Sequence, residues 1–114
     1  MRSLILLHLF LSLLVSPAFS IRVGGWRPIE DIDDTHVKEI AEYAIFEYNK
    51  GQNTLLTFSR VVKGETQVVA GVNYRLLVQV KGGEDGSTME YEVVVWEKPW
   101  LKFMQLTSFK PIEY

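Results

Sequence analysis

Residues 67–71 read Gln67-Val68-Val69-Ala70-Gly71 and connect two segments, 55–63 and 72–81, whose alternating apolar residues predict β-strands. A connection between antiparallel strands is normally polar, with Gly, Asn or Asp at its bend. Apolar side chains at a hairpin tip find little of their own core to pack against. They become buried when a partner covers them, which favours a binding site. The alternative is that Val68 and Val69 begin the next strand, and periodicity alone leaves both interpretations open.

An amphipathic helix is expected before these strands. Asp33, Asp34 and Thr35 offer capping side chains for its start, and Gly51 offers a left-handed residue for its end. Apolar residues recur between them at helical spacing: Val37, Ile40, Ala41, Ala44, Ile45 and Tyr48. This stripe predicts a helix that packs one face against the rest of the core.

After the helix the apolar period changes from 3.6 to 2, which predicts strands with one buried face. The expected rows on the three successive strands are Leu56, Phe58, Arg60 and Val62, then Val72, Tyr74, Leu76, Val78 and Val80, then Met89, Tyr91, Val93 and Val95. A last strand is expected over 101–109. One helix followed by strands with short connections predicts an α+β domain with an antiparallel meander.

The meander predicts where the connections lie. Turns alternate between the two ends of such a sheet, so the turn at 67–71 and the turn at Pro99-Trp100 are expected at the same end. The turn at 82–87 is expected at the other end. A tryptophan held on a turn by a preceding proline is a typical anchor for a partner's pocket. The alternative is that Trp100 folds back onto the core.

Residues 1–20 have the pattern of a secretory signal. A basic start, an apolar run over 4–15, and small residues at Ala18 and Ser20 match the features that a signal peptidase recognises. The run is too short for a membrane span of about 20 residues. We therefore expect a removed signal at 1–20, a domain at 21–114, and secretion or diversion to a vacuole. The alternative is a signal anchor that stays attached.

Composition excludes several classes of function. The formal net charge of −2 becomes −3 when removal of residues 1–20 takes away Arg2, so neither nucleic acid nor, after signal removal, a membrane is an expected partner. The chain has no cysteine, which excludes disulfides, a thiol nucleophile and thiolate metal sites. Nothing in the sequence resembles a metal-ligand cluster, and no cofactor is expected.

A Ser/His/Asp triad would need His36, which the meander is expected to place far from both hairpin tips, so an enzyme is not expected.

Three features together resemble the cystatins, inhibitors of papain-like cysteine proteases. They are the glycine pair Gly24-Gly25 before the helix, the 67–71 segment, which matches the family's Gln-x-Val-x-Gly loop, and Pro99-Trp100, which matches its second loop. Residues 40–49 resemble the helix motif of plant cystatins. The resemblance runs from about residue 24 to residue 109, and the absence of cysteine fits the plant branch.

The resemblance implies a cystatin fold, an antiparallel β-sheet of four to five strands wrapped around one α-helix. It also implies reversible, competitive inhibition, in which three segments form a wedge that enters the protease cleft. The implied protease-binding residues are Gly24, Gly25, Gln67, Val68, Val69, Ala70, Gly71, Pro99 and Trp100. A monomer is expected, with exchange of the helix and first strand between two chains as the alternative. The competing function is a cystatin-fold binding or storage protein that does not inhibit.

Overall fold

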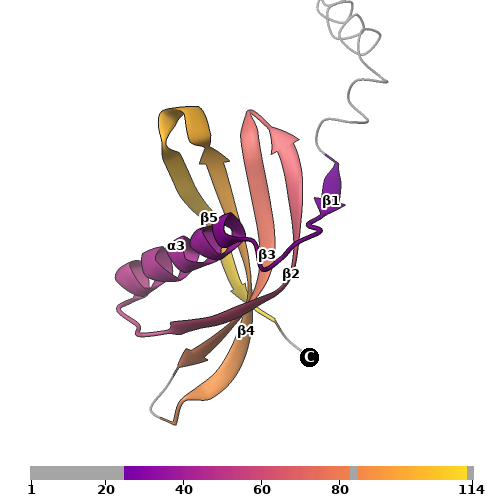
Figure 1. Ribbon diagram of the computed structural model, residues 1–114. Coiled ribbons are helices and arrows are strands. Elements are labelled where there is room, and N and C mark those ends of the chain that lie inside the picture. The colour runs from indigo at the N-terminus through magenta and orange to yellow at the C-terminus, as the bar shows by residue number, and fades with distance from the viewer. Residues whose placement is uncertain (1–24, 83–84, 113–114) are drawn as a thin grey trace, which may run out of the picture.

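The structure is a computed structural model that describes residues 25–82 and 85–112 of the chain. Its elements are β1 (Trp26–Pro28), α3 (Thr35–Gln52), β2 (Thr57–Val69), β3 (Gly71–Gly82), β4 (Ser87–Lys98), the 3₁₀ turn η1 (Pro99–Leu101) and β5 (Phe103–Pro111). The strands form an antiparallel sheet in chain order, and α3 lies across one of its faces (Figure 1). The predicted α+β fold is confirmed. The expected signal at 1–20 and Gly24 lie outside the described residues.

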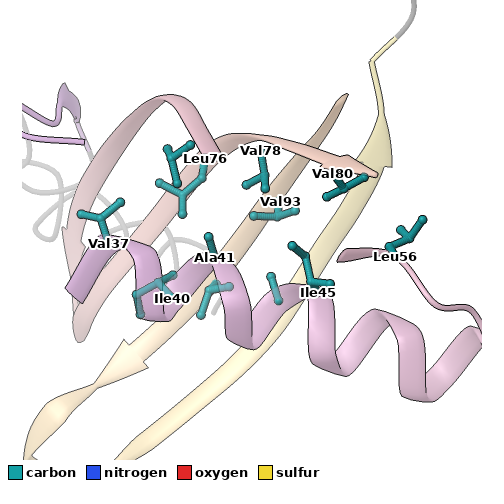
Figure 2. Close-up of a cluster of buried hydrophobic side chains, with 12 residues drawn as sticks. Val37, Ile40, Ala41, Ile45, Leu56, Leu76, Val78, Val80 and Val93 are labelled. Carbon is teal, nitrogen blue, oxygen red and sulfur yellow. The ribbon is translucent and has the colours of Figure 1, made fainter. Parts of the chain in front are cut away.

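The core is the contact between the apolar stripe of α3 and the inward row of the sheet. Ile40, Ala41 and Ala44 of the helix are fully buried. The sheet residues against them come from β3 and β4, and the fully buried ones are Leu76, Val78, Val80, Val93 and Val95 (Figure 2). The predicted helical stripe and the predicted rows of the second and third long strands therefore form the core or pack against it, except Val72, which is only partly buried at the hairpin end of β3.

The row predicted for the first long strand is confirmed at Leu56 and Phe58 but wrong at Arg60 and Val62. The β2–β3 pairing shifts register between Phe58 and Arg60 and again between Val61 and Lys63. A bulge places two residues of one strand opposite one of its partner and moves the side chains that follow to the other face. The second bulge restores the original alternation, since Gly64 lies opposite Leu76 and is buried. Val61 is consequently buried, at 5% exposed, while Arg60 is exposed. The pattern of residue types does not reveal this shift, because a bulge leaves the alternation on each side of it intact.

The end of the helix also differs from the prediction. Gly51 remains helical, and Asn53 takes the left-handed conformation at φ 57° and ψ 46°, with its N–H bonded to the carbonyl of Asn49. Asparagine adopts this conformation more readily than other non-glycine residues. The side chain of Asn49 then holds the chain that enters β2, since its amide group bonds both the N–H and the carbonyl of Leu56.

Two connections have different bounds from those expected. Strand β2 runs through Val69 and β3 begins at Gly71, so Val68 and Val69 end the first strand and do not begin the second. Residues 67–71 are therefore the closed end of a hairpin, with Ala70 between its strands. Strand β5 starts two residues later than predicted because Pro99 opens a 3₁₀ turn and Lys102, at φ 50°, closes it.

Because the helix docks through fully buried side chains, shortening one of them should destabilise the whole domain. We expect Ile40→Ala to lower the free energy of unfolding by about 2–5 kcal/mol, through lost burial and the cavity left behind. Urea denaturation followed by circular dichroism measures this change. Lys38→Ala, on the exposed face of the same helix, should change it by less than about 0.5 kcal/mol. Equal effects of the two substitutions would contradict the assigned helix face.

Candidate functional site

Three segments that are far apart in the chain meet at one end of the sheet. The β2–β3 and β4–β5 connections both lie at the top of Figure 1, as the meander predicts. Trp26 pairs with Gln67, which brings the preceding residue, Gly25, beside the first hairpin tip. We call this end of the molecule, made of Gly25, residues 67–71 and η1, the rim. Of the predicted site residues, the structure brings together all but Gly24, which it does not describe.

The rim carries exposed apolar side chains. Val68 is 59% exposed, Trp100 is 65% exposed and Leu101 is 61% exposed. Trp100 therefore does not fold back onto the core. Leu101 was not singled out by the sequence analysis, because its place after Pro99-Trp100 suggested the start of a strand. The 3₁₀ turn instead presents it beside Trp100.

Gly71 is required by the close approach of two backbones. It has a φ of +103°, and a Cβ at this position would lie 2.2 Å from the carbonyl oxygen of Glu97. Any other residue would meet both backbone strain and a clash with backbone atoms that cannot move aside. The glycine thus lets the β2–β3 tip pack directly against the end of β4.

Hydrogen bonds hold the side chains and backbone of the rim in place. The Asn73 amide donates to the Gln67 side-chain oxygen across the hairpin, at 2.9 Å. The Trp96 indole N–H donates to the Ala70 carbonyl, at 2.8 Å. In the second hairpin, the N–H of Lys102 donates to the carbonyl of Pro99, at 3.0 Å, which closes η1. Trp96 is a rim-supporting residue that sequence reasoning missed. The sequence feature that could have indicated this role was a tryptophan on the solvent-facing row of β4.

The expectation that His36 lies far from the hairpin tips is wrong. Its Nε2 lies 2.8 Å from Oε1 of Glu97, and its Nδ1 lies 3.1 Å from Oε1 of Glu39. Glu97 is paired with Val72, immediately after Gly71, and its side chain is buried. The start of α3 therefore packs beside the rim. The sequence does not predict this position of His36, because the apolar stripe indicates which face of the helix is buried but not the direction in which the helix crosses the sheet.

This cluster shifts two pKa values. The hydrogen bond to Glu97 raises the pKa of His36 above its usual 6.5, burial opposes that change, and Glu39 adds to it. Burial raises the pKa of Tyr74 to about 12, and the carboxylate of Glu97 contributes to the increase. The His36 and Tyr74 rings also meet edge to face, with centroids 6.0 Å apart. Glu97 is thus a buried carboxylate that is stabilised by a partner from the helix.

Two further findings concern the described part of the chain. Residues 25–82 and 85–112 hold no cluster of three or more His, Asp or Glu side chains arranged to bind a metal. Over the same residues, no helix has both the length and the apolar character needed to span a bilayer.

Stability should depend on pH through His36. A raised folded-state pKa stabilises the native protein fully below the unfolded pKa of about 6.5, and this contribution disappears as the pH rises through the folded pKa. The difference in unfolding free energy between the wild type and His36→Gln should therefore be larger near pH 5 than near pH 8.5. Urea denaturation at both pH values measures it. In a Glu97→Gln background, the pH-dependent part of this free-energy difference should shrink. If Glu97 is present and the free-energy difference is the same at both pH values, the proposed role of His36 is contradicted.

Comparisons with known proteins identify the family. A family model described as "Aspartic acid proteinase inhibitor" matches residues 29–112. The chain is 50% identical to cysteine proteinase inhibitor 5 of Arabidopsis thaliana, over 95% of this chain and 88% of the relative, and 47% identical to cysteine proteinase inhibitor 1 of Actinidia chinensis var. chinensis, over 81% and 78%. A salivary cystatin of the soft tick Ornithodoros moubata superposes with a TM-score of 0.68 at 25% identity, over 79% of this chain and 98% of the tick protein. The chain therefore belongs to the plant cystatins, a family of protease inhibitors and not of enzymes.

Proposed function

We propose that this protein is a reversible, competitive inhibitor of papain-like cysteine proteases and that its rim enters the active-site cleft of the target. One observation carries the proposal: three separate segments meet at one end of the sheet and expose apolar side chains there. Val68, Trp100 and Leu101 are each more than half exposed. Relatives that are 50% and 47% identical are named cysteine proteinase inhibitors, which supports the same target class here.

The exposed apolar side chains give the rim its affinity. In water they contribute little to folding, because more than half of each side chain is exposed. Inside an apolar groove each becomes buried, and apolar burial is favourable by roughly 25 cal/mol per Å². The hairpins are already ordered, so docking loses little conformational entropy. An interface of about 1,600 Å² would be typical for an inhibitor of this kind.

The shape of the first hairpin explains inhibition without cleavage. A protease cleaves a segment that lies extended through its active site with one carbonyl carbon open to the nucleophile. Val69 is paired with Gly71 across the hairpin, so the chain reverses at Ala70 and cannot lie extended there. The tip would cover the catalytic cysteine and block substrate by occupying the cleft. No covalent step is needed, so the inhibition is reversible.

The other segments would occupy the cleft on either side of the tip. Gly24-Gly25 would let the chain follow the wall on the substrate side, and Pro99-Trp100 would fill the leaving side. Gln67 would shape the tip, since its side-chain oxygen accepts the hydrogen bond from Asn73. Val68, Val69 and Ala70 would make the direct contacts, and Gly71 would allow the tip to pack on β4.

The test is a panel of inhibition constants for the protein without residues 1–20. Papain-like cysteine proteases and pepsin-like aspartic proteases are both included, because the family model and the named relatives point to different protease classes. We expect competitive, reversible inhibition of the cysteine proteases. Absence of inhibition at micromolar concentrations would favour a binding or storage protein. Inhibition of the aspartic proteases alone would also overturn the proposal.

Trp100→Ala should weaken inhibition of papain by about 2 kcal/mol, or about 30-fold in the inhibition constant, because it removes a large anchor from the interface. The melting temperature should stay nearly constant, since the side chain packs little on the core. The matched control is Phe46→Ala, which removes a similarly exposed aromatic ring from the outer side of α3. Equal inhibition constants for the two variants would contradict the assignment of Trp100 to the interface.

We also propose that the active form is a monomer. Exchange of α3 and β2 between two chains would require β2 and β3 to separate at Ala70 and run on as one strand. That change would remove the first hairpin tip from the rim, so a dimer of this kind should not inhibit. Size-exclusion chromatography with light scattering, followed by assay of each fraction, tests this.

Residues 1–20 are proposed to direct the protein into the secretory route, to the cell exterior or a vacuole, and to be removed. Expression of the full chain in plant cells should yield a product that begins near Ile21. Intact mass spectrometry of the apoplastic and vacuolar fractions measures where it begins and where it accumulates. A product that retains residues 1–20 in a membrane fraction would show a signal anchor instead.

A further inference from the structure

We propose that Trp96 is a positioning residue for protease binding. Its indole N–H ties the tip of the β2–β3 hairpin to β4, so that the rim presents its two hairpins as one rigid unit. The role in binding rests on the function proposed above. Trp96 itself lies on the solvent-facing row of β4 and belongs to none of the three segments that would enter the cleft.

The tie is a hydrogen bond to Ala70, the residue of the tip that lies between β2 and β3. The Nε1 of Trp96 lies 2.8 Å from the carbonyl oxygen of Ala70. Residues on either side of Ala70 are held by the β2–β3 ladder, in which Val69 pairs with Gly71. That ladder joins β2 to β3 only. The indole bond joins the tip to β4, the strand that leads into the second hairpin.

The second hairpin fixes the orientation of the indole ring. The Lys98 ammonium lies 4.2 Å from the centroid of the Trp96 ring, a cation–π distance. The ring of Phe103, at the start of β5, meets the indole edge-on at 5.6 Å and an interplanar angle of 80°. Both neighbours flank η1 in the sequence, so the ring that holds Ala70 is itself held by the two ends of the turn that carries Trp100.

A second contact sets how closely the tip can approach β4. At Gly71 the backbone packs so near the Glu97 carbonyl that a Cβ would lie 2.2 Å from its oxygen. This packing limits movement of the tip toward β4, and the indole bond limits movement away from it. The two contacts together fix the position of the first hairpin tip relative to η1.

A fixed spacing matters because both hairpins must fit one cleft at the same time. A tip that moves independently would lose conformational entropy on docking, and ordering even a few groups costs a substantial part of the binding free energy. Loss of the tie should therefore weaken inhibition even though Trp96 does not touch the protease. A purely structural role would lower the stability of the domain and leave the inhibition constant unchanged.

The experiment compares Trp96→Phe with the wild-type inhibitor lacking residues 1–20. Phenylalanine keeps a ring for Lys98 and Phe103 but has no N–H to donate. A second variant carries 3-benzothienylalanine at position 96, which keeps the size of the indole and replaces the N–H by sulfur. The control is Tyr48→Phe, which removes a polar group from an aromatic ring stacked on Phe109, away from the rim. The readouts are the inhibition constant for papain, the hydrogen-exchange rates of the Ala70 and Gly71 amides in the free protein, and the melting temperature.

We expect both Trp96 variants to raise the inhibition constant about tenfold and to speed exchange at the tip about tenfold, with Tyr48→Phe within twofold of wild type. If Trp96→Phe does not fold, the inference is tested with the 3-benzothienylalanine variant alone. An unchanged inhibition constant in a folded variant overturns the inference. If the wild type fails to inhibit papain, the proposed function is overturned, and the exchange rates still test the tie. In that case, faster hydrogen exchange at the tip supports the tie between Trp96 and Ala70, and unchanged exchange overturns it.

Discussion

The packing of one helical stripe against one face of the sheet is the contact on which the rest of the structure depends. The chain has no cysteine, so no disulfide can hold the strands together. Stability must come from the apolar residues that α3 and the sheet bury between them, several of which have no exposed surface at all. Because this core lies in the middle of the sheet, the hairpin ends are not needed for it. They are free to carry exposed apolar residues such as Val68 and Trp100 that would otherwise be a liability.

The core and the rim are nevertheless joined, through the start of the helix. His36 follows the N-cap residue Asp34 by two positions and reaches the buried carboxylate of Glu97. The backbone of that same glutamate packs on Gly71, and its neighbour Trp96 bonds the Ala70 carbonyl. The first hairpin tip is therefore positioned by residues of β4, and β4 is in turn held by the helix. Docking of the helix and the geometry of the rim are parts of one arrangement.

The elements with an unbroken period were predictable from the sequence. The helix stripe and the rows of β3 and β4 follow 3.6- and 2-residue repeats, and the fold class and the common end of the two hairpins follow from them. The bulges in β2 were not predictable, because each adds one residue to the pairing without altering the residue types. The sequence also does not predict the hydrogen bond between Trp96 and Ala70 or the contact between His36 and Glu97. Both join residues whose proximity depends on the twist of the sheet and the crossing direction of the helix.

The residues that form the core and the exposed apolar residues of the rim are separate sets. The family model that matches residues 29–112 carries the name of an aspartic proteinase inhibitor, whereas relatives at 50% and 47% identity are named for cysteine proteinases. The named plant relatives share the family of this chain, and the tick cystatin shares its fold. A fold of this kind does not by itself select a protease class. Selection requires groups that meet the target directly, and under the function proposed above those are the exposed side chains of the rim. The segment at Gly25 precedes the matched residues altogether. Because the core of this chain is separate from its hairpin ends, substitutions at exposed rim residues such as Val68 and Trp100 would leave the packing of the helix on the sheet in place.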